Sequence, residues 1–242
     1  MTRHDNDRTR AYFTDGARDV TPAAVQDAAR VLYVPFADDP EISRHCASVL
    51  SDVELQRAAR FVAERDRDRF RQRRAFRRFC GAIARGSSAP LSQIHFEDTD
   101  SGRPYLADLP GTWFSFSGCR SGFLGAWSST QAIGVDLEDR TSDVEALQLA
   151  SRFFTGAEAE VVAGTLGPAR LQTFVRFWCL KEAALKSIGE GLAFGLDAFE
   201  FALAPSLHVV GAPAEHGGPE RFDAHAIDGT GAGAALVIRG RS

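Results

Sequence analysis

The segment 171–186 restricts the fold of this chain most, because its spacing is that of a long helix with a carboxylate on its apolar face. Apolar residues recur there at steps of three, four or seven: Leu171, Phe174, Val175, Trp178 and Leu185. This spacing predicts a helix that buries one side against a neighbouring layer. Glu182 follows Trp178 by four residues and falls on the same side, where a carboxylate needs a cation or a metal ion as its partner.

The same helix holds both lysines of the chain, Lys181 and Lys186, whereas the other cationic side chains are arginines. A lysine places a compact charge beside a phosphate in a way that the planar guanidinium of arginine does not reproduce. We therefore expect an anionic ligand near this helix. An ordinary helix ion pair between Glu182 and Lys186, worth about 0.2–0.5 kcal/mol, remains the alternative.

Composition indicates a globular protein with a real core. The chain has 242 residues, of which 44% are hydrophobic and 25% charged, which suits one large domain or two modest ones. A net charge of −4 gives no reason to expect nucleic-acid binding. With no apolar run of membrane-spanning length and no hydrophobic leader, we expect a cytoplasmic protein that does not bind a membrane. The scattered cysteines favour buried thiols over zinc or disulfides: Cys46, Cys80, Cys119 and Cys179.

The first half of the chain is strongly basic. Residues 1–29 read as a polar extension or a short surface helix, 31–36 as a strand, and about 42–83 as a helical region that is broken once. Ten arginines lie between Arg57 and Arg78, and most of them suit a solvated face. Arg69 and Arg73, however, continue the apolar stripe of a helix, which favours a cleft with an anion such as phosphate.

A series of short strands and turns is expected next. Residues 94–96 form a short strand and 98–105 a turn containing Arg103 and Pro104, where Pro104 fixes its own backbone. Residues 113–117 and 123–127 read as two strands around a polar turn. Ser117 and Gly118 offer a hydroxyl and an open amide to a phosphate, although an ordinary hairpin turn explains them as well.

The segment 132–138 predicts a strand with two carboxylates on one face. Period two places Ile133, Val135 and Leu137 on one side, and Asp136 and Glu138 on the other. Two like charges there suggest a divalent cation with hard oxygen ligands, most simply Mg²⁺, or else a solvated polar face. Helices over 143–153 and 157–162 and strands over 198–203, 207–210, 222–227 and 234–238 complete an α+β chain.

With these segments assembled, the sequence resembles the Sfp-type 4′-phosphopantetheinyl transferases. The segment 134–138 (GVDLE) resembles the family's Gly-Ile-Asp-Ile-Glu, and 178–186 (WCLKEAALK) resembles its Trp-x-x-Lys-Glu-x-x-x-Lys, in the same order and at a matching separation. Weaker matches are 102–104 (GRP) to Gly-Lys-Pro and 152–154 (RFF) to Arg-Phe-Phe. The similarity extends over about residues 50–201.

The resemblance implies a pseudo-dimer of two similar α+β halves with coenzyme A and Mg²⁺ in the cleft between them. It divides the chain into a polar extension (1–29), an N-terminal half (30–130) and a C-terminal half with the metal site (131–242). A monomer with internal pseudo-two-fold symmetry is expected.

The resemblance also assigns site residues. The metal would be held by Asp136, Glu138 and Glu182, and Lys186 would meet the pyrophosphate; Glu182 and Lys186 are the expected catalytic residues. The resemblance places Arg69 at the 3′-phosphate of coenzyme A and Arg103 on the adenylate side, and it matches Ser117 to a serine of the family. The further candidates for coenzyme A binding are Arg73, Pro104, Gly118, Lys181 and Lys186. For Lys181 an ion pair within the protein and a contact with the carrier protein are also open. The family usually has a histidine where this chain has Gly118, so one phosphate contact is missing or comes from a neighbour such as Arg120.

The expected activity is transfer of the phosphopantetheine arm of coenzyme A to a serine of an acyl or peptidyl carrier protein. Adenosine 3′,5′-bisphosphate would leave, and Glu182 or a water on the metal would take the serine proton. Two alternatives remain: a non-catalytic module that binds coenzyme A or a carrier protein, and a Mg²⁺-dependent hydrolase of phosphate anhydrides. The pathway that the carrier serves, whether fatty acid, polyketide or nonribosomal peptide synthesis, stays open.

Overall fold

The computed structural model of the chain describes residues 3–139 and 143–240. Its N-terminal part (residues 3–128) contains α1 (Arg3–Gly16), β1 (Arg18–Asp19), β2 (Arg30–Pro35), α2 (Pro40–Ser48), α3 (Asp52–Ala59), α4 (Glu64–Ala84), β3 (Glu97–Asp98), β4 (Pro104–Tyr105), β5 (Trp113–Gly118) and β6 (Gly122–Ser128). Its C-terminal part (residues 132–240) contains β7 (Ala132–Glu138), α5 (Asp143–Phe153), α6 (Gly156–Gly164), α7 (Pro168–Ile188), β8 (Glu200–Ala202), β9 (His208–Gly211), β10 (Phe222–Ala226) and β11 (Gly233–Arg239).

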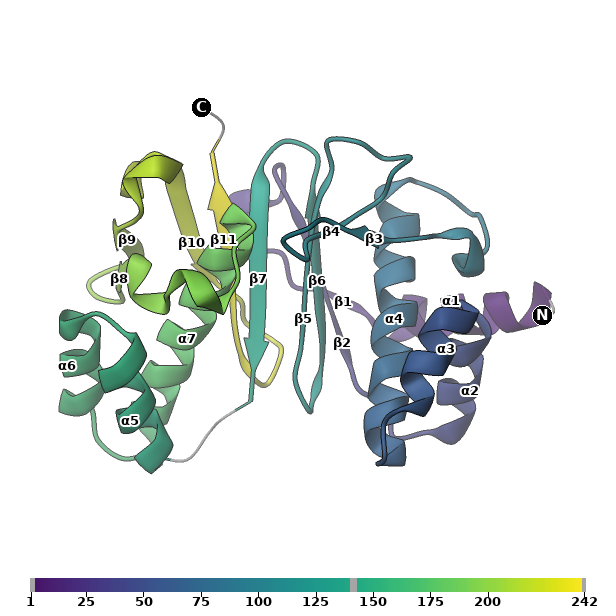
Figure 1. The fold of residues 1–242 in the computed structure, drawn as a ribbon, viewed down its shortest axis with the longest axis horizontal. Helices are drawn as coiled ribbons and strands as arrows, with labels where there is room; N and C mark the ends of the chain where they lie inside the picture. The colour runs from purple at the N-terminus through teal and green to yellow at the C-terminus, as the bar shows by residue number, and fades with distance from the viewer. Residues whose placement is uncertain (1–2, 140–142, 241–242) are drawn as a thin grey trace.

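Two antiparallel sheets lie against each other in the middle of the molecule (Figure 1). The first sheet has the order β1-β2-β6-β5, and the second has the order β10-β11-β7. Helix α4 covers the outer face of the first sheet and α7 the outer face of the second, so the layers run helix, sheet, sheet, helix. This arrangement agrees with the expected α+β class.

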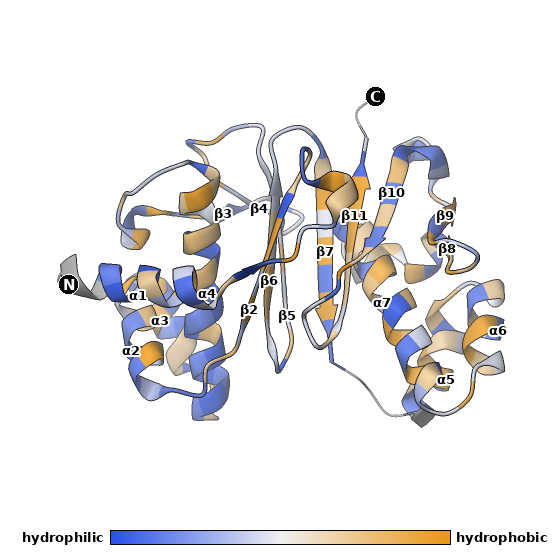
Figure 2. Cartoon of the chain, turned by 180° about the vertical axis from the view of Figure 1, so that it is seen from behind, coloured by the Kyte–Doolittle hydropathy of each residue, from blue (hydrophilic) through white to orange (hydrophobic). Residues whose placement is uncertain are grey.

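Strand β7 contributes side chains to two interfaces: one of its faces packs against the first sheet and the other against α7. Its hydrophobic and hydrophilic residues alternate along the strand (Figure 2), as the pleat of a strand requires. Ile133, Val135 and Leu137 are at most 1% exposed and pack against β2 and β6. The alternate residues face α7, and this side therefore carries Asp136 and Glu138.

Gly134 allows α7 to lie close to β7. A Cβ atom at this position would stand 1.9 Å from the carbonyl oxygen of Ala183 and 2.6 Å from the nitrogen of Ser187. No side chain fits into that space, so only glycine permits this approach. Two residues further along the strand, Asp136 consequently lies directly beneath the helix.

The ends of α7 are set by local sequence. Pro168 stands in the first turn, where its missing N–H costs no hydrogen bond, and Gly189 ends the helix with a φ of +80°. The preceding helix α6 begins with a capping box between Thr155 and Glu158. These signals place both helices where the sequence predicted them.

Three expectations about the N-terminal part need correction. Residues 3–16 form a helix, but α1 is more than a surface feature, because Phe13 is fully buried in the core of this part. The region 42–83 is broken twice, since a capping box at Ser51 starts α3 separately from α2 and α4. Residues 94–96 form no strand, because the carbonyl of Ile94 accepts a 2.6 Å hydrogen bond from Arg78.

None of the helices in the described ranges combines the length and apolar character that crossing a bilayer would require.

Candidate active site

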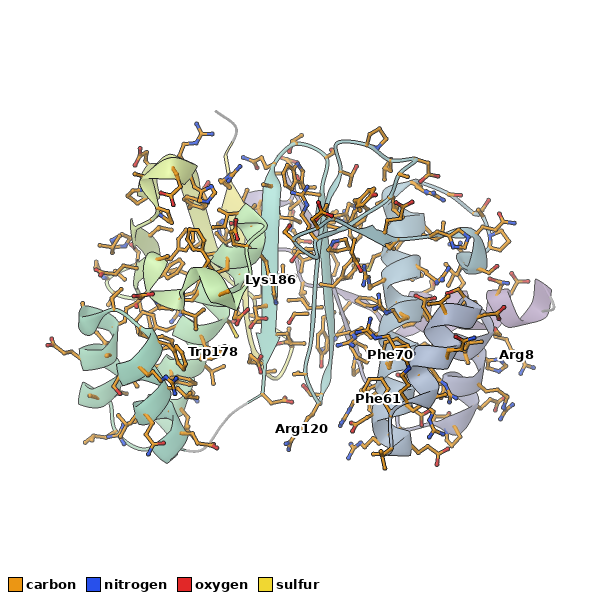
Figure 3. All side chains as sticks on the ribbon, in the orientation of Figure 1. Arg8, Phe61, Phe70, Arg120, Trp178 and Lys186 are labelled. Atoms are coloured by element: carbon orange, nitrogen blue, oxygen red, sulfur yellow. The ribbon has the colours of Figure 1, made fainter. Side chains whose placement is uncertain are left out.

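Lys186 is the centre of the candidate site and lies beside β7 (Figure 3). Its contacts reach β7 of the second sheet and β5 of the first, and we call the boundary between these two strands the seam. Its ammonium donates to Asp136 Oδ1 at 2.6 Å, to the Val135 carbonyl at 3.2 Å and to Ser117 Oγ at 3.4 Å. Ser117 on β5 in turn donates to the same Asp136 oxygen at 2.8 Å. Helix α7, strand β7 and strand β5 therefore meet at one ammonium group, and both parts of the chain contribute.

The three predicted metal ligands repel one another, because their carboxylates lie close together. Burial, followed by repulsion from Asp136, raises the pKa of Glu138 to about 7, although Lys186 opposes the shift. Burial also raises the pKa of Glu182, where Lys186 lowers it and Asp136 raises it. Asp136 itself is 2% exposed, and its Oδ2 atom is buried without a hydrogen-bond partner among the described residues.

The oxygen donors at this site are of the kind that a hard cation prefers, but they are not arranged around a common point. Within residues 3–139 and 143–240, no three carboxylate, thiol or imidazole side chains converge on one point as metal ligands would. Lys186 neutralises Asp136 instead. The unpartnered Oδ2 atom and the repulsion that Glu138 and Glu182 each feel from Asp136 are nevertheless what a cation such as Mg²⁺ would relieve.

Arg103 and Pro104 lie at one end of the seam, in a pocket of about 130 Å³ that Lys186 also lines. The Arg103 guanidinium stacks on the ring of Trp113 at 3.9 Å, and burial followed by repulsion from Arg239 lowers its pKa. Sequence reasoning found Arg103 but missed Trp113, whose place in the strand pattern did not distinguish it from a core aromatic.

Arg69 and Arg73 lie in a second pocket, of about 170 Å³, between α4 and the β5–β6 turn (residues 118–122). Arg69 pairs with Asp66 at 3.2 Å and lies over the Phe36 ring. The pKa of Arg73 is lowered by burial and then by repulsion from Arg74 and Arg57. The pocket is thus a confined cationic site.

Gly118 faces Arg73 in this second pocket. A Cβ atom at Gly118 would stand 2.9 Å from Phe123 Cδ1 and 3.6 Å from Arg73 Cδ. Phe123 therefore disfavours any larger residue there. The sequence leaves the phosphate contact at this position either missing or supplied by a neighbour such as Arg120. In the structure Arg73 approaches Gly118, and Arg120 lies at the tip of the turn (Figure 3).

Of the roles left open for Lys181, contact with coenzyme A needs correction and an ion pair within the protein is confirmed, because the side chain is fully buried and pairs with Glu158. Its ammonium pairs with Glu158 Oε2 at 2.5 Å and donates to the carbonyls of Leu196 at 3.0 Å and Phe199 at 2.6 Å. All three donor positions of the ammonium are satisfied. Lys181 is a structural residue that ties α7 to α6 and to the start of β8.

Two further residues at the seam escaped sequence reasoning. Ser115 accepts a 3.0 Å hydrogen bond from the Val135 backbone nitrogen and so links β5 of the first sheet to β7 of the second. Asp139 binds the β5–β6 turn through its carboxylate. A serine in a strand and an aspartate after one are common, and neither position carried a signal of its own.

The family model and the similar proteins point to the same family. Residues 132–228 match a family model described as the 4′-phosphopantetheinyl transferase superfamily. The chain is 34% identical over 188 residues to the 4′-phosphopantetheinyl transferase HetI of Nostoc sp., which covers 75% of this chain and 77% of that protein. It is 29% identical over 164 residues to the 4′-phosphopantetheinyl transferase Sfp of Bacillus subtilis, covering 64% of this chain and 72% of that protein.

A vertebrate relative extends the comparison. The chain is 30% identical over 177 residues to the L-aminoadipate-semialdehyde dehydrogenase-phosphopantetheinyl transferase of Xenopus laevis. This match covers 69% of the chain and 58% of that protein. The matched family model includes the positions of Asp136, Glu138, Glu182 and Lys186.

Proposed function

Because this chain belongs to the 4′-phosphopantetheinyl transferase superfamily, we propose that it moves the phosphopantetheine arm of coenzyme A onto a serine of a carrier protein. The observation that carries the proposal is the 2.6 Å contact between Lys186 and Asp136, which joins the two motifs at the seam. We further propose Mg²⁺ as the metal, acyl or peptidyl carrier proteins as partners, and a monomer acting in the cytoplasm.

The side chains suggest a division of roles. Asp136, Glu138 and Glu182 would hold the metal, which when bound supplies positive charge against the phosphates. Lys186 places its ammonium where the pyrophosphate charge grows as the reaction proceeds. Arg69 and Arg73 at one end, and Arg103 stacked on Trp113 at the other, would orient coenzyme A along the seam.

The transfer itself is a displacement at phosphorus. Glu182, whose pKa is raised by burial, is suited to take the proton from the serine hydroxyl. The serine oxygen then forms a bond to the β-phosphorus while the bond from that phosphorus to the bridging oxygen breaks. Adenosine 3′,5′-bisphosphate leaves with the bond electrons, and Lys186 stabilises the charge that develops.

Intact-mass analysis tests the proposed activity. The protein is incubated with coenzyme A, Mg²⁺ and a panel of apo carrier proteins, and a carrier is expected to gain the mass of the phosphopantetheine arm. The matched control is the same carrier with its acceptor serine changed to alanine. If no carrier gains the arm, the proposal fails; phosphate or phosphopantetheine released without a carrier would point to a hydrolase instead.

A further inference from the structure

Asp139 connects the C-terminal part to a turn of the N-terminal part. It follows Glu138 directly at the end of β7. Its Oδ2 atom accepts a 2.7 Å hydrogen bond from the backbone nitrogen of Arg120, and its Oδ1 atom accepts a 3.0 Å hydrogen bond from the hydroxyl of Ser121. A residue next to a predicted metal ligand thus holds the β5–β6 turn.

The held turn forms one wall of the cationic pocket. Gly118 and Cys119 line that pocket from the turn, and Arg69 and Arg73 line it from α4. Arg69 also donates to the Arg120 carbonyl at 3.5 Å. The position of the turn therefore sets the distance between its backbone and the two arginines.

Charge in the pocket favours an anion of small size. Arg73 has no acidic partner among the described residues, and its burial beside other arginines is costly. Asp66 lines the pocket as well and pairs with Arg69, so a bound anion has to compete with one carboxylate. A volume of about 170 Å³ exceeds the roughly 10–15 Å³ that a single water needs, which leaves room for a phosphate group.

The negative charge of Asp139 would by itself weaken anion binding this close to the pocket. Two donors offset that charge, and both belong to the turn. The benefit of the carboxylate is therefore geometric: it keeps the turn in place.

We propose that Asp139 is a positioning residue that holds the β5–β6 turn and thereby shapes the pocket for the phosphate monoester of coenzyme A. The inference rests on the proposed function, because it takes coenzyme A as the ligand. It couples the pocket to the carboxylates of Asp136 and Glu138, since all three residues stand within one segment of backbone.

The test compares coenzyme A with 3′-dephospho-coenzyme A, which lacks the phosphate monoester. In Asp139→Ala we expect KM for coenzyme A to rise about 10-fold, because small misplacements of binding groups are costly, with kcat changed less. KM for the dephospho compound should stay unchanged, because it leaves the pocket empty. Asp139→Asn keeps an acceptor for the Arg120 nitrogen and should fall in between.

Two further variants keep the comparison decisive. Asp228→Ala removes an exposed carboxylate on the β10–β11 turn and should leave both KM values unchanged. If Asp139→Ala does not fold, Ser121→Ala removes one of the two hydrogen bonds and should show the same selective rise in smaller measure.

Several outcomes would overturn the inference: equal rises in KM for both compounds, no rise for either, or a loss confined to kcat. Calorimetry with the wild-type protein separates this failure from that of the proposed function. A wild-type protein that binds no coenzyme A and modifies no carrier contradicts the function itself. Wild-type binding that Asp139→Ala leaves intact contradicts only the role of Asp139.

Discussion

At the scale of single residues, the three carboxylates of the seam are expected to act as one unit. Asp136→Ala and Glu182→Ala should each lower kcat/KM by about 10²-fold or more, and the double variant should be little worse than either single variant, because both remove the same metal. The mass assay measures these rates, with circular dichroism as a control for folding. Losses that multiply in the double variant would contradict a shared ion.

Lys181 is expected to affect stability rather than chemistry. Lys181→Met leaves the buried carboxylate of Glu158 without its partner, which should lower the free energy of unfolding by about 3–5 kcal/mol. Adding Glu158→Gln should recover part of that loss, since the remaining charge is removed. Urea denaturation measures both. An unchanged midpoint in Lys181→Met would show that the pair contributes little.

The raised pKa of Glu138 predicts that the free energy of unfolding depends on pH when no metal is bound. Its pKa is raised from an ordinary 4.5 to about 7, so the folded state binds its proton more tightly than the unfolded state does. The stability that this group contributes is complete below about pH 4.5 and is lost as the pH rises through about 7.

The matching measurement is urea denaturation with a chelator at pH 5 and pH 8. From pH 5 to pH 8, the free energy of unfolding of the wild-type protein should fall by roughly 1 kcal/mol more than that of Glu138→Gln. This value already includes a reduction for solvent screening. Glu215→Gln, at an exposed position, is the control and should show no such difference. The same gap between wild type and Glu138→Gln at both pH values would contradict the prediction.

At the scale of elements, the contact between β7 and α7 depends on Gly134. Gly134→Ala places a methyl group against the Ala183 carbonyl, which should lower the free energy of unfolding by about 1–3 kcal/mol through overpacking and should reduce transfer by shifting Lys186. Gly164→Ala is the matched control, because nothing lies within 4 Å of its Cβ position. Thermal unfolding and the mass assay together check this, and equal behaviour of the two variants would contradict it.

The elements also show what the sequence predicts well. The pattern of β7 predicted residues 132–138, which is the observed strand, because period two separates the apolar side chains of one face from the two carboxylates of the other. The region of α7 was recognised from its apolar stripe, and the structure adds its ends at Pro168 and Ile188. The strand expected at 94–96 failed because Arg78, sixteen residues earlier, takes the carbonyl of Ile94.

The candidate site was predictable from the sequence only where a residue stands out within its own segment. Glu182 stood out as a carboxylate on an apolar stripe, Asp136 as one of two like charges on a strand face, and Lys186 as one of only two lysines in the chain. Lys181 is the other lysine, yet its partner Glu158 lies on another helix, and no local rule pairs the two. Asp139 and Trp113 obey their local patterns, so only the folded chain reveals them.

At the scale of the whole molecule, the two parts of the chain are expected to unfold together. Buried residues of β2, β6, β7 and β11 form one shared apolar cluster between the sheets, so neither sheet keeps both faces covered alone. The near-ultraviolet signal, with Trp113 and Trp127 in one part and Trp178 in the other, should change at the same urea concentration as the far-ultraviolet signal. Two separate transitions would contradict this.

The position of Lys186 against Ser117 has a practical consequence. The ammonium comes from one part of the chain and the hydroxyl from the other, and only residues 129–131 connect β6 to β7. If the chain were divided at this link, each fragment would carry an incomplete site. Catalytic turnover would then report the reassembly of the fragments, so the seam can serve as the basis of a split-enzyme sensor.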